Sequence, residues 1–369
     1  MTVPRPATPP GGPVPALFEP ITLRDLTVRN RVWLAPMCQY SATDGVPHDW
    51  HLVNLGARAS GGFGLLLTEA AAVVPEGRIS PEDAGLWNDE QAQAWRRVVD
   101  FVHTQGAAIG VQLAHAGRKA STYRPWAGSE GTVPAAEGGW TSRGPSPVPF
   151  EGYAAPTALD AREIADVVEA FATAARRAVE VGFDTVELHA AHGYLFHEFL
   201  SPLSNHRDDA WGGDFEGRAR LLLETTDAVR AAIPEGMPLL VRISATDWLD
   251  GGWDLEQSTR LAGLLRERGV DLVDVSSGGN AAASIPVEPG YQVPLSAGVR
   301  SAGVPTGAVG LITEPAQAEK VLSNGEADVV LLARAAIREP SWPLRAAHEL
   351  GVPVDEAPWP PQHARGTWR

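Results

Sequence analysis

Cysteine is almost absent from this chain, which has a single one, Cys38, among its 369 residues. One thiol excludes an internal disulfide, because that bond needs two cysteines in the same chain. It also excludes an iron–sulfur cluster ligated only by cysteines of this chain, since such clusters need several thiolates. The shortage of cysteine favours a cytoplasmic protein over a disulfide-stabilised secreted one.

Basic residues are also in short supply: 30 Lys and Arg stand against 45 Asp and Glu, for a formal net charge of −15. This balance argues against nucleic acid and anionic membrane surfaces as partners, because both are bound by basic patches. No apolar run approaches the roughly 20 residues needed to cross a bilayer. Residues 1–16 lack the hydrophobic segment of a secretory signal, and their Pro and Gly content predicts a flexible tail.

What the chain does contain is a regular alternation of short apolar segments with helical periodicity. Capping boxes at Asn88 and Asp160 mark the starts of two helices, and Thr313 is expected to cap a third. The apolar segments predict eight strands, over residues 31–37, 64–69, 107–113, 184–188, 238–244, 272–277, 309–312 and 328–333. Because parallel strands buried on both faces read as continuous apolar runs, this pattern predicts an α/β fold, a (β/α)8 TIM barrel over residues 17–354. A doubly wound sheet is the alternative, but no G-x-G-x-x-G follows the first strand.

Two segments depart from this alternation. Residues 114–158, after the third predicted strand, are rich in Gly, Pro, Ser and Trp and show no sustained periodicity. A loop of this length inside a compact chain is typical of a lid or a binding loop. Residues 355–369 form a Pro-rich C-terminal arm with two Trp and two Arg. So aromatic a segment is expected to pack against a protein surface.

Polar side chains gather where the fourth predicted strand ends, with His189, His192 and Tyr194 in close succession. Barrel enzymes place their chemistry at the C-terminal ends of the strands, so this group predicts an active site. Two alternatives stay open here, because such histidines could also be buried structural residues or zinc ligands. The spacing H-A-A-H lacks the Glu of the zincin helix motif. We interpret His197 and His206 as structural.

The ends of the other predicted strands share this face of the barrel. They carry Cys38, Tyr40, Ala70, Gln112, His115, Arg242, residues 276–279, Gly310 and Arg334. The set has no carboxylate pair suited to glycosidic chemistry and no acidic cage for a divalent metal. Small residues beside Arg334 on the last two strands predict a phosphate site, for either a cofactor or a phosphorylated substrate.

The longest motifs of the chain lie at these same strand ends. They are A-P-M-C-Q-Y (35–40), T-E-A (68–70), V-Q-L-A-H-A-G-R-K (111–119) and H-A-A-H-G-Y-L-F-H-E-F-L-S-P-L-S-N-H-R (189–207). On these motifs the chain resembles the Old Yellow Enzyme family of flavin-dependent ene-reductases. More narrowly, it resembles the bacterial, thermophilic-like branch of that family, which has a cysteine on the first strand. The resemblance extends over residues 17–368 and implies a (β/α)8 barrel that holds FMN noncovalently.

The resemblance implies a flavin site at the strand ends. The residues that it assigns to the cofactor are Ala35, Pro36, Met37, Cys38, Ala70, Gln112, Arg242, Ser277, Gly278, Gly310, Ala333 and Arg334. Cys38 would tune the redox potential of the ring, and Arg242 would face the edge where negative charge collects on reduction. Ala333 and Arg334 would hold the phosphate. The family usually has Gly-Arg at this place, so Ala333 is a departure that is harmless only if its φ is negative.

The resemblance also implies a reaction. His189 and His192 would polarise the carbonyl group of an α,β-unsaturated substrate, and Tyr194 would protonate the α-carbon as hydride from the flavin reaches the β-carbon. NADPH would reduce the flavin in the same pocket, giving ping-pong turnover, with nitro compounds as a second substrate class. Tyr40 would contact the substrate. Arg365 would reach this site from the neighbouring subunit of a homodimer, or of a homotetramer built from dimers.

Other functions compete with this interpretation. A larger dienoyl-reductase relative with an iron–sulfur cluster is excluded by the single cysteine and by the lack of a second domain. A metal-dependent barrel hydrolase would use His189 and His192 as ligands. A flavin or ligand carrier would share the fold without the catalysis.

Overall fold

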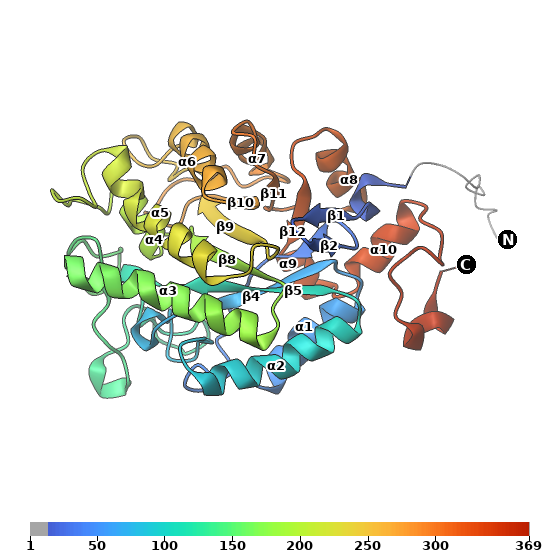
Figure 1. Ribbon diagram of the computed structural model, residues 1–369, viewed down its shortest axis with the longest axis horizontal. Coiled ribbons are helices and arrows are strands. Elements are labelled where there is room, and N and C mark those ends of the chain that lie inside the picture. The colour runs from blue at the N-terminus through green and yellow to red at the C-terminus, as the bar shows by residue number, and fades with distance from the viewer. Residues whose placement is uncertain (1–13, 369) are drawn as a thin grey trace.

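Eight parallel strands close into a barrel in the computed structural model, which describes residues 14–368 (Figure 1). In order around the barrel, they are β3 (Val32–Leu34), β4 (Leu65–Ala72), β5 (Ala108–Ala114), β8 (Thr185–Ala190), β9 (Leu239–Ser244), β10 (Leu272–Ser276), β11 (Thr306–Ala308) and β12 (Val329–Leu332). Strand β12 pairs with β3 and completes the ring. The predicted (β/α)8 TIM barrel is therefore confirmed. Most of the predicted N-terminal tail, residues 1–16, lies outside the described part of the chain.

Helices cover the outside of the barrel (Figure 1). They are α1 (Asp49–Ser60), α2 (Asp89–Thr104), α3 (Ala161–Val181), α4 (Leu195–Leu200), α5 (Phe215–Ala232), α6 (Leu255–Glu267), α7 (Val293–Arg300), α8 (Pro315–Ser323), α9 (Arg334–Arg338) and α10 (Trp342–Glu349). The predicted capping boxes are confirmed, because Asn88 and Asp160 each accept a hydrogen bond from the backbone N–H three residues on, as α2 and α3 begin. Within residues 14–368, no helix is both long and apolar enough to cross a membrane.

The inside of the barrel is apolar at one end and polar at the other. The apolar end is filled by buried side chains of the barrel strands: Trp33, Leu65, Leu67, Leu240, Leu272, Val329 and Leu331. An antiparallel hairpin of β1 (Ile21–Leu23) and β2 (Leu26–Val28) covers this end. Side chains two residues apart on a strand share a face, so the positions after Leu240 and Leu272 that also point inward are Arg242 and Asp274. The polar end therefore lies at the C-terminal ends of the strands.

The seventh strand lies earlier in the chain than predicted, at Thr306–Ala308 instead of residues 309–312. A Cβ atom on Gly307 would lie 2.4 Å from the Leu331 side chain, so only glycine lets β11 approach β12 this closely. Gly310, at φ +115°, turns the following segment out of the sheet, although Val309 and Ile312 are buried. The prediction for Thr313 was also wrong, because α8 begins at Pro315 after Glu314, without a side-chain cap. Burial alone made residues 309–312 resemble a strand.

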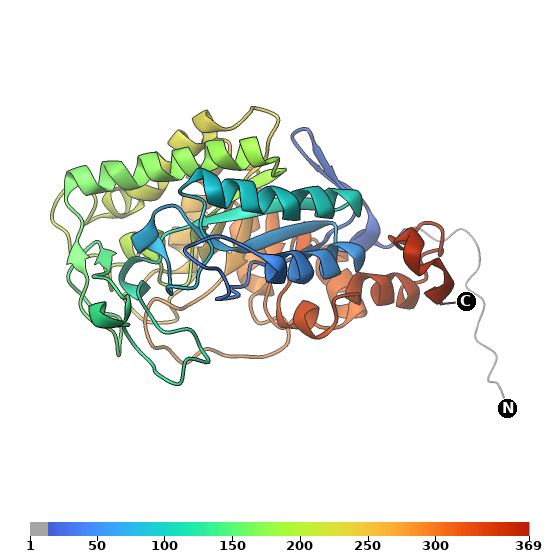
Figure 2. The ribbon, with the colours of Figure 1, turned by 90° about the horizontal axis from the view of Figure 1, so that it is seen from below.

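The long loop after β5, residues 114–158, lies at the end of the molecule away from the two termini (Figure 2). It contains only short elements: η3 (Gly117–Lys119), η4 (Ala135–Glu137), β6 (Arg143–Gly144) and β7 (Thr157–Ala158). The buried Arg118 guanidinium fastens it, donating to the carbonyl of Val148 within the loop and to that of Asn280 after β10. The loop thus covers the C-terminal ends of the strands, where a lid was predicted.

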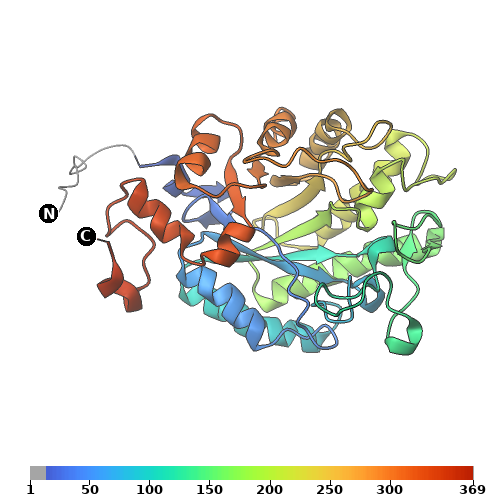
Figure 3. The same ribbon diagram turned by 180° about the vertical axis from the view of Figure 1, so that it is seen from behind.

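The described part of the C-terminal arm, residues 355–368, lies at the other end of the barrel, beside α10 (Figure 3). The Trp368 ring stacks on His348 of α10 at 5.0 Å between centroids and meets Trp359 edge-on at 5.4 Å. Arg365 lies on the exposed turn η5 (Pro361–Gly366), and no ion pair joins it to another described residue. The aromatic residues therefore pack against α10 of their own chain, while Arg365 is far from the strand ends of its own barrel.

Candidate active site

The turn after β8 brings the predicted catalytic residues into one place. His189 is the second-last residue of β8 and is 4% exposed, while His192 follows in a left-handed conformation at φ +60°. Left-handed backbone costs about 1 kcal/mol or more for a residue other than glycine. Gly193 must be glycine, because its φ is +72° and a Cβ atom would lie 2.3 Å from the carbonyl oxygen of Gly279.

Two side chains from other elements hold this strained turn. The Ser244 hydroxyl, at the end of β9, accepts a hydrogen bond of 2.9 Å from the His192 backbone N–H. The Lys119 ammonium donates to the carbonyl oxygens of His192 and Gly279, at 2.8 and 3.0 Å. Burial lowers the pKa of Lys119 to about 8. The sequence alone assigned Lys119 no role, because the carbonyl groups that it binds lie on distant loops.

The rings of His189, His192 and Tyr194 form a single cluster. The centroids of the two imidazoles are 5.2 Å apart, and that of Tyr194 lies 5.0 Å from His189, both pairs edge-to-face. His192 Nε2 lies 2.8 Å from the Ser276 hydroxyl, a contact that the sequence did not single out. If this hydroxyl donates, the one N–H of a neutral imidazole stays on the other ring nitrogen. His189 Nδ1 is buried and has no hydrogen-bond partner among the described residues.

Burial sets the protonation of this cluster. It lowers the pKa of His189 and of His192 well below the ordinary value, and the nearby Arg242 cation lowers both further. Burial also raises the pKa of the Tyr194 phenol well above its ordinary value. At neutral pH the site therefore presents two neutral imidazoles and a neutral phenol, which are hydrogen-bond donors without net charge.

Cys38 and Tyr40 lie across a small apolar surface from Tyr194. This surface is formed by Ala70, Ile79, Ala114, Ala116 and Ala120, against which Cys38, Tyr40, Trp140 and Tyr194 pack. Burial raises the pKa of the Cys38 thiol, and the carboxylates of Asp83 and Glu69 raise it further, so the thiol is neutral. The Tyr40 ring meets Trp126 of the long loop edge-on at 5.8 Å. The predicted residues of strands β3, β4 and β8 thus share one pocket wall with the loop.

A buried carboxylate holds the turn that carries Cys38, and sequence reasoning had not given it a role. Glu69 Oε2 accepts a 3.0 Å hydrogen bond from the Gln39 backbone N–H, and Glu69 Oε1 lies 3.0 Å from His51 Nε2. The T-E-A motif contains this glutamate. The motif therefore supports the turn after β3 in addition to forming part of β4.

The inward side chains of β5 and β9 form the floor of the site. Gln112 is buried at the level of Ala70 on the neighbouring strand. Arg242 is 6% exposed, and its guanidinium lies 3.4 Å from the Pro36 carbonyl oxygen. Ala35 and Pro36 are buried, while Met37 is half-buried. The structure therefore brings the residues predicted for a flavin ring to one level of the barrel.

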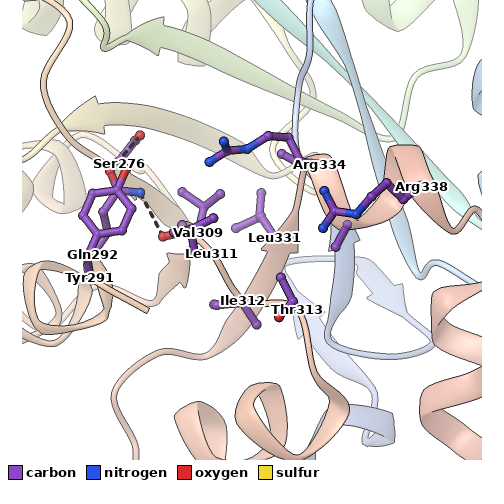
Figure 4. Close-up of a pocket in the computed structure, with 13 residues that line it drawn as sticks. Ser276, Tyr291, Gln292, Val309, Leu311, Ile312, Thr313, Leu331, Arg334 and Arg338 are labelled. Atoms are coloured by element: carbon purple, nitrogen blue, oxygen red, sulfur yellow. Dashed lines mark hydrogen bonds between the residues drawn. The ribbon is translucent and has the colours of Figure 1, made fainter. Parts of the chain in front are cut away.

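The residues predicted for a phosphate line a cavity of about 160 Å³ at the ends of β11 and β12 (Figure 4). The guanidinium groups of Arg334 and Arg338 both face it (Figure 4), and neither forms an ion pair with another described residue. Arg338 was not predicted, because helical spacing beyond the strand end brings it there. Ala333 has φ −106°, so its departure from glycine causes no left-handed strain.

Gln292 organises the wall of this cavity and was also missed. Its Nε2 donates to the Val309 carbonyl at 2.9 Å, and its Oε1 accepts from the Ser277 hydroxyl at 2.6 Å. A Cβ atom on Gly310 would lie 2.6 Å from Gln292 Nε2, which explains a glycine at this position. Gly278 packs next to Trp248, with its carbonyl oxygen accepting from Ser244.

These features fit FMN. Two guanidinium groups without carboxylate partners suit a phosphate dianion. A buried amide and a buried guanidinium beneath small residues suit the polar edge of a flat ring. Among residues 14–368 there is no group of three His, Cys, Asp or Glu placed to share a metal ion.

Comparisons with known proteins agree with this geometry. A family model described as "NADH:flavin oxidoreductase / NADH oxidase family" matches residues 16–352. An NADPH dehydrogenase of Geobacillus thermodenitrificans (strain NG80-2) is 47% identical over 357 residues, which cover 96% of this chain and 98% of the relative.

Two solved structures show the same fold. A complex of 2-naphthoyl-CoA reductase with 2-naphthoyl-CoA has a TM-score of 0.82 at 27% identity, covering 90% of this chain and 52% of that one. This chain therefore spans about half the length of that reductase. An Old Yellow Enzyme homologue from Zymomonas mobilis has a TM-score of 0.76 at 28% identity, covering 95% of this chain and 98% of that one.

Proposed function

The chain belongs to the NADH:flavin oxidoreductase / NADH oxidase family and is a flavin oxidoreductase of the Old Yellow Enzyme type, and on this premise we propose that it reduces the C=C bond of α,β-unsaturated carbonyl compounds with NADPH. The observation that carries this proposal is the cluster of two neutral imidazoles with a neutral phenol, 5.2 and 5.0 Å apart. A cluster of uncharged donors is suited to hold a carbonyl oxygen and to supply one proton beside it.

Two regions would hold noncovalently bound FMN: the floor of the site and the cavity at the ends of β11 and β12. Gln112 and Arg242 would bind the edge of the ring, below Ala35 and Ala70, and Arg334 with Arg338 would bind the phosphate. When bound, FMN supplies the hydride that it has received from NADPH.

His189 and His192 would donate hydrogen bonds to the carbonyl oxygen of the substrate. Negative charge grows on this oxygen as hydride reaches the β-carbon, and fixed donors in a buried site stabilise it. Tyr194 would give its hydroxyl proton to the α-carbon, so that one hydride and one proton add across the double bond. A phenol of raised pKa is a weak acid, yet it suffices for a strongly basic carbon centre. NADPH and the alkene would use this pocket in turn, so turnover would be ping-pong.

The absorbance spectrum of the purified protein, followed by an NADPH oxidation assay with a cyclic enone, tests this function. We expect a band near ~450 nm that leaves the protein on denaturation, as noncovalent flavin requires, and NADPH oxidation that depends on the enone. Flavin without enone-dependent oxidation of NADPH would favour the carrier alternative, and a colourless protein would contradict the cofactor assignment. A nitroalkene in place of the enone tests the second substrate class.

Replacing Cys38 by Ala is expected to shift the midpoint potential of the flavin and the affinity for substrate without abolishing turnover. The thiol is neutral and packs beside Ala70, so it tunes its surroundings and forms no covalent bond with substrate. A redox titration with a reference dye measures the potential, and Ser41→Ala on the same loop is the control. An unchanged potential and unchanged ligand binding would leave Cys38 as a packing residue.

We also propose that the C-terminal arm completes the active site of a neighbouring subunit. Arg365 is exposed at the end of its own barrel away from the strand ends, so it can reach a catalytic site only in another copy. Arg365→Ala is expected to weaken binding of substrate or NADPH by on the order of 10- to 100-fold, the effect of losing one charge-assisted hydrogen bond, while FMN stays bound.

Two measurements check the arm. Steady-state kinetics of Arg365→Ala are compared with those of Arg176→Ala, an exposed arginine on α3. Sedimentation of a chain lacking residues 360–369 is expected to show a weakened dimer. An intact dimer with unaltered kinetics would mean that the arm serves only to pack against α10.

A further inference from the structure

Two buried carboxyl groups inside the barrel have no role in the reaction described above. Glu187 on β8 and Asp274 on β10 are both 0% exposed. Strand register places Glu187 beside Gln112 and Asp274 beside Arg242, so all four side chains point into the barrel. Two of the four, Gln112 and Arg242, are the residues assigned to the ring of the cofactor.

The two carboxyl groups have different partners. Glu187 Oε1 accepts a hydrogen bond of 2.7 Å from Gln112 Nε2. Asp274 Oδ2 lies 3.0 Å from Arg242 Nε, close enough for an ion pair although not aligned for a hydrogen bond. The second oxygen of each carboxyl group, Glu187 Oε2 and Asp274 Oδ1, is buried with no hydrogen-bond partner among the described residues.

Among the described residues, no charged side chain other than that of Arg242 forms an ion pair or a hydrogen bond with either carboxyl group. The inside of the barrel on the N-terminal side of the pair is lined by apolar residues such as Trp33, Leu67 and Leu331. His189, in register with Arg242, is neutral, because burial and then the Arg242 cation lower its pKa. If both carboxyl groups were ionised, two negative charges would face one positive charge in an enclosed apolar space. A buried charge without a counter-ion costs far more than a buried neutral acid.

We propose that Glu187 and Asp274 hold one proton between them at neutral pH and that Glu187 carries it. Asp274 is then the sole counter-ion of Arg242, and the interior below the ring site has no net charge. The assignment follows from the guanidinium, which lies against Asp274, whereas Glu187 contacts only an amide. Burial, and next the charge of Asp274, raise the pKa of Glu187 to about 8, in agreement with the geometry.

This proton makes Glu187 a positioning residue for the cofactor site. The Glu187 carboxyl group accepts the Gln112 amide N–H and so leaves the amide oxygen free to bind the ring, while the proton keeps this contact without adding a charge. Loss of the proton would place a second anion below the edge where the reduced ring gathers negative charge. The consequence for the cofactor rests on the proposed function, but the location of the proton concerns this chain alone and can be measured without any substrate.

Infrared spectroscopy of the holoenzyme with ¹³C-labelled glutamate tests the assignment. The carbonyl stretch of a protonated, buried glutamic acid moves on labelling, whereas those of aspartic acid and FMN do not. Glu198 is a second buried glutamate whose pKa burial raises to about 8, so variants are needed to separate the two. We expect a glutamic acid component that disappears in Glu187→Gln and persists in Glu198→Gln and in the exposed control Glu180→Gln.

A stability measurement gives an independent readout. The folded-state pKa of Glu187, about 8, lies above the ordinary value of 4.5. Folding therefore takes up a proton between these values, and the stability that this uptake contributes declines as pH rises through about 8. Glu187→Gln cannot titrate, so its unfolding temperature should rise relative to wild type from acid to alkaline pH, while that of Glu180→Gln should not. Because glutamine keeps the acceptor for Gln112, the dissociation constant of FMN should stay within about threefold of the wild-type value. This change is smaller than the tenfold change that corresponds to about 1.4 kcal/mol.

The results that overturn the proposal are equally defined. If Glu187→Gln loses no glutamic acid component relative to wild type, the proton lies elsewhere, and unfolding curves parallel to wild type at all pH values would lead to the same conclusion. If Glu187→Gln does not fold, Glu198→Gln decides: a remaining glutamic acid component supports the proposal, and its absence refutes it. None of these outcomes depends on whether the protein reduces enones.

Discussion

Replacing Tyr194 by Phe is expected to slow reduction of the alkene by on the order of 10²–10⁴-fold, the usual contribution of a positioned general acid. Reduction of the flavin by NADPH should stay within about threefold of wild type, because that half-reaction needs no proton from the protein at the substrate carbon. The ring of phenylalanine keeps the edge-to-face contact with His189 at 5.0 Å, so the pocket keeps its shape. The loss is therefore confined to one hydroxyl group.

Stopped-flow absorbance of the flavin separates the two half-reactions. Tyr123→Phe is the matched control, because it removes a tyrosine hydroxyl from the long loop after β5, where that hydroxyl binds Glu137 at 2.8 Å and takes no part in the cluster. Equal losses in both half-reactions of Tyr194→Phe would show that the tyrosine shapes the pocket and does not donate the proton.

Replacing His192 by Ala is expected to slow alkene reduction by about 10²–10³-fold, the effect of removing one donor to a developing oxyanion. His192→Asn should recover part of this loss for two reasons. Asparagine keeps an N–H donor, and it tolerates the left-handed backbone at φ +60° better than alanine does. The comparison therefore separates the hydrogen bond from the ring.

The pH dependence provides a further check on His192. Because burial and Arg242 lower its pKa well below the ordinary value, the imidazole stays neutral across the neutral range. The rate of alkene reduction should then show no inflection near the ordinary histidine pKa of about 6.5. Stopped-flow traces between about pH 5.5 and 8 measure this rate. An inflection near 6.5 that His192→Asn abolishes would show that the histidine acts in its charged form.

The local pattern of the sequence was sufficient for the architecture and for the centre of the site. Helices α2 and α3 begin at Asn88 and Asp160 as predicted, because a capping box is a contact among four consecutive residues. His189, His192 and Tyr194 could be grouped because they lie within six residues at the end of one strand. Signals of this kind depend on neighbours along the chain, and the fold leaves them intact.

Other features depend on residues that meet only after folding. The position of β11 is decided by the fit of Gly307 against Leu331, and the apolar residues 309–312 gave no sign of it. Lys119 and Ser276 gain their roles from a carbonyl group and an imidazole on other loops.

The pairing of Glu187 with Gln112 and of Asp274 with Arg242 arises from strand register alone, between residues at least 32 positions apart in the chain. The sequence by itself therefore determined the order of the elements and the residues at one strand end. The tertiary structure decided which charges share the closed interior of the barrel, because burial and counter-ions are properties of the assembled strands.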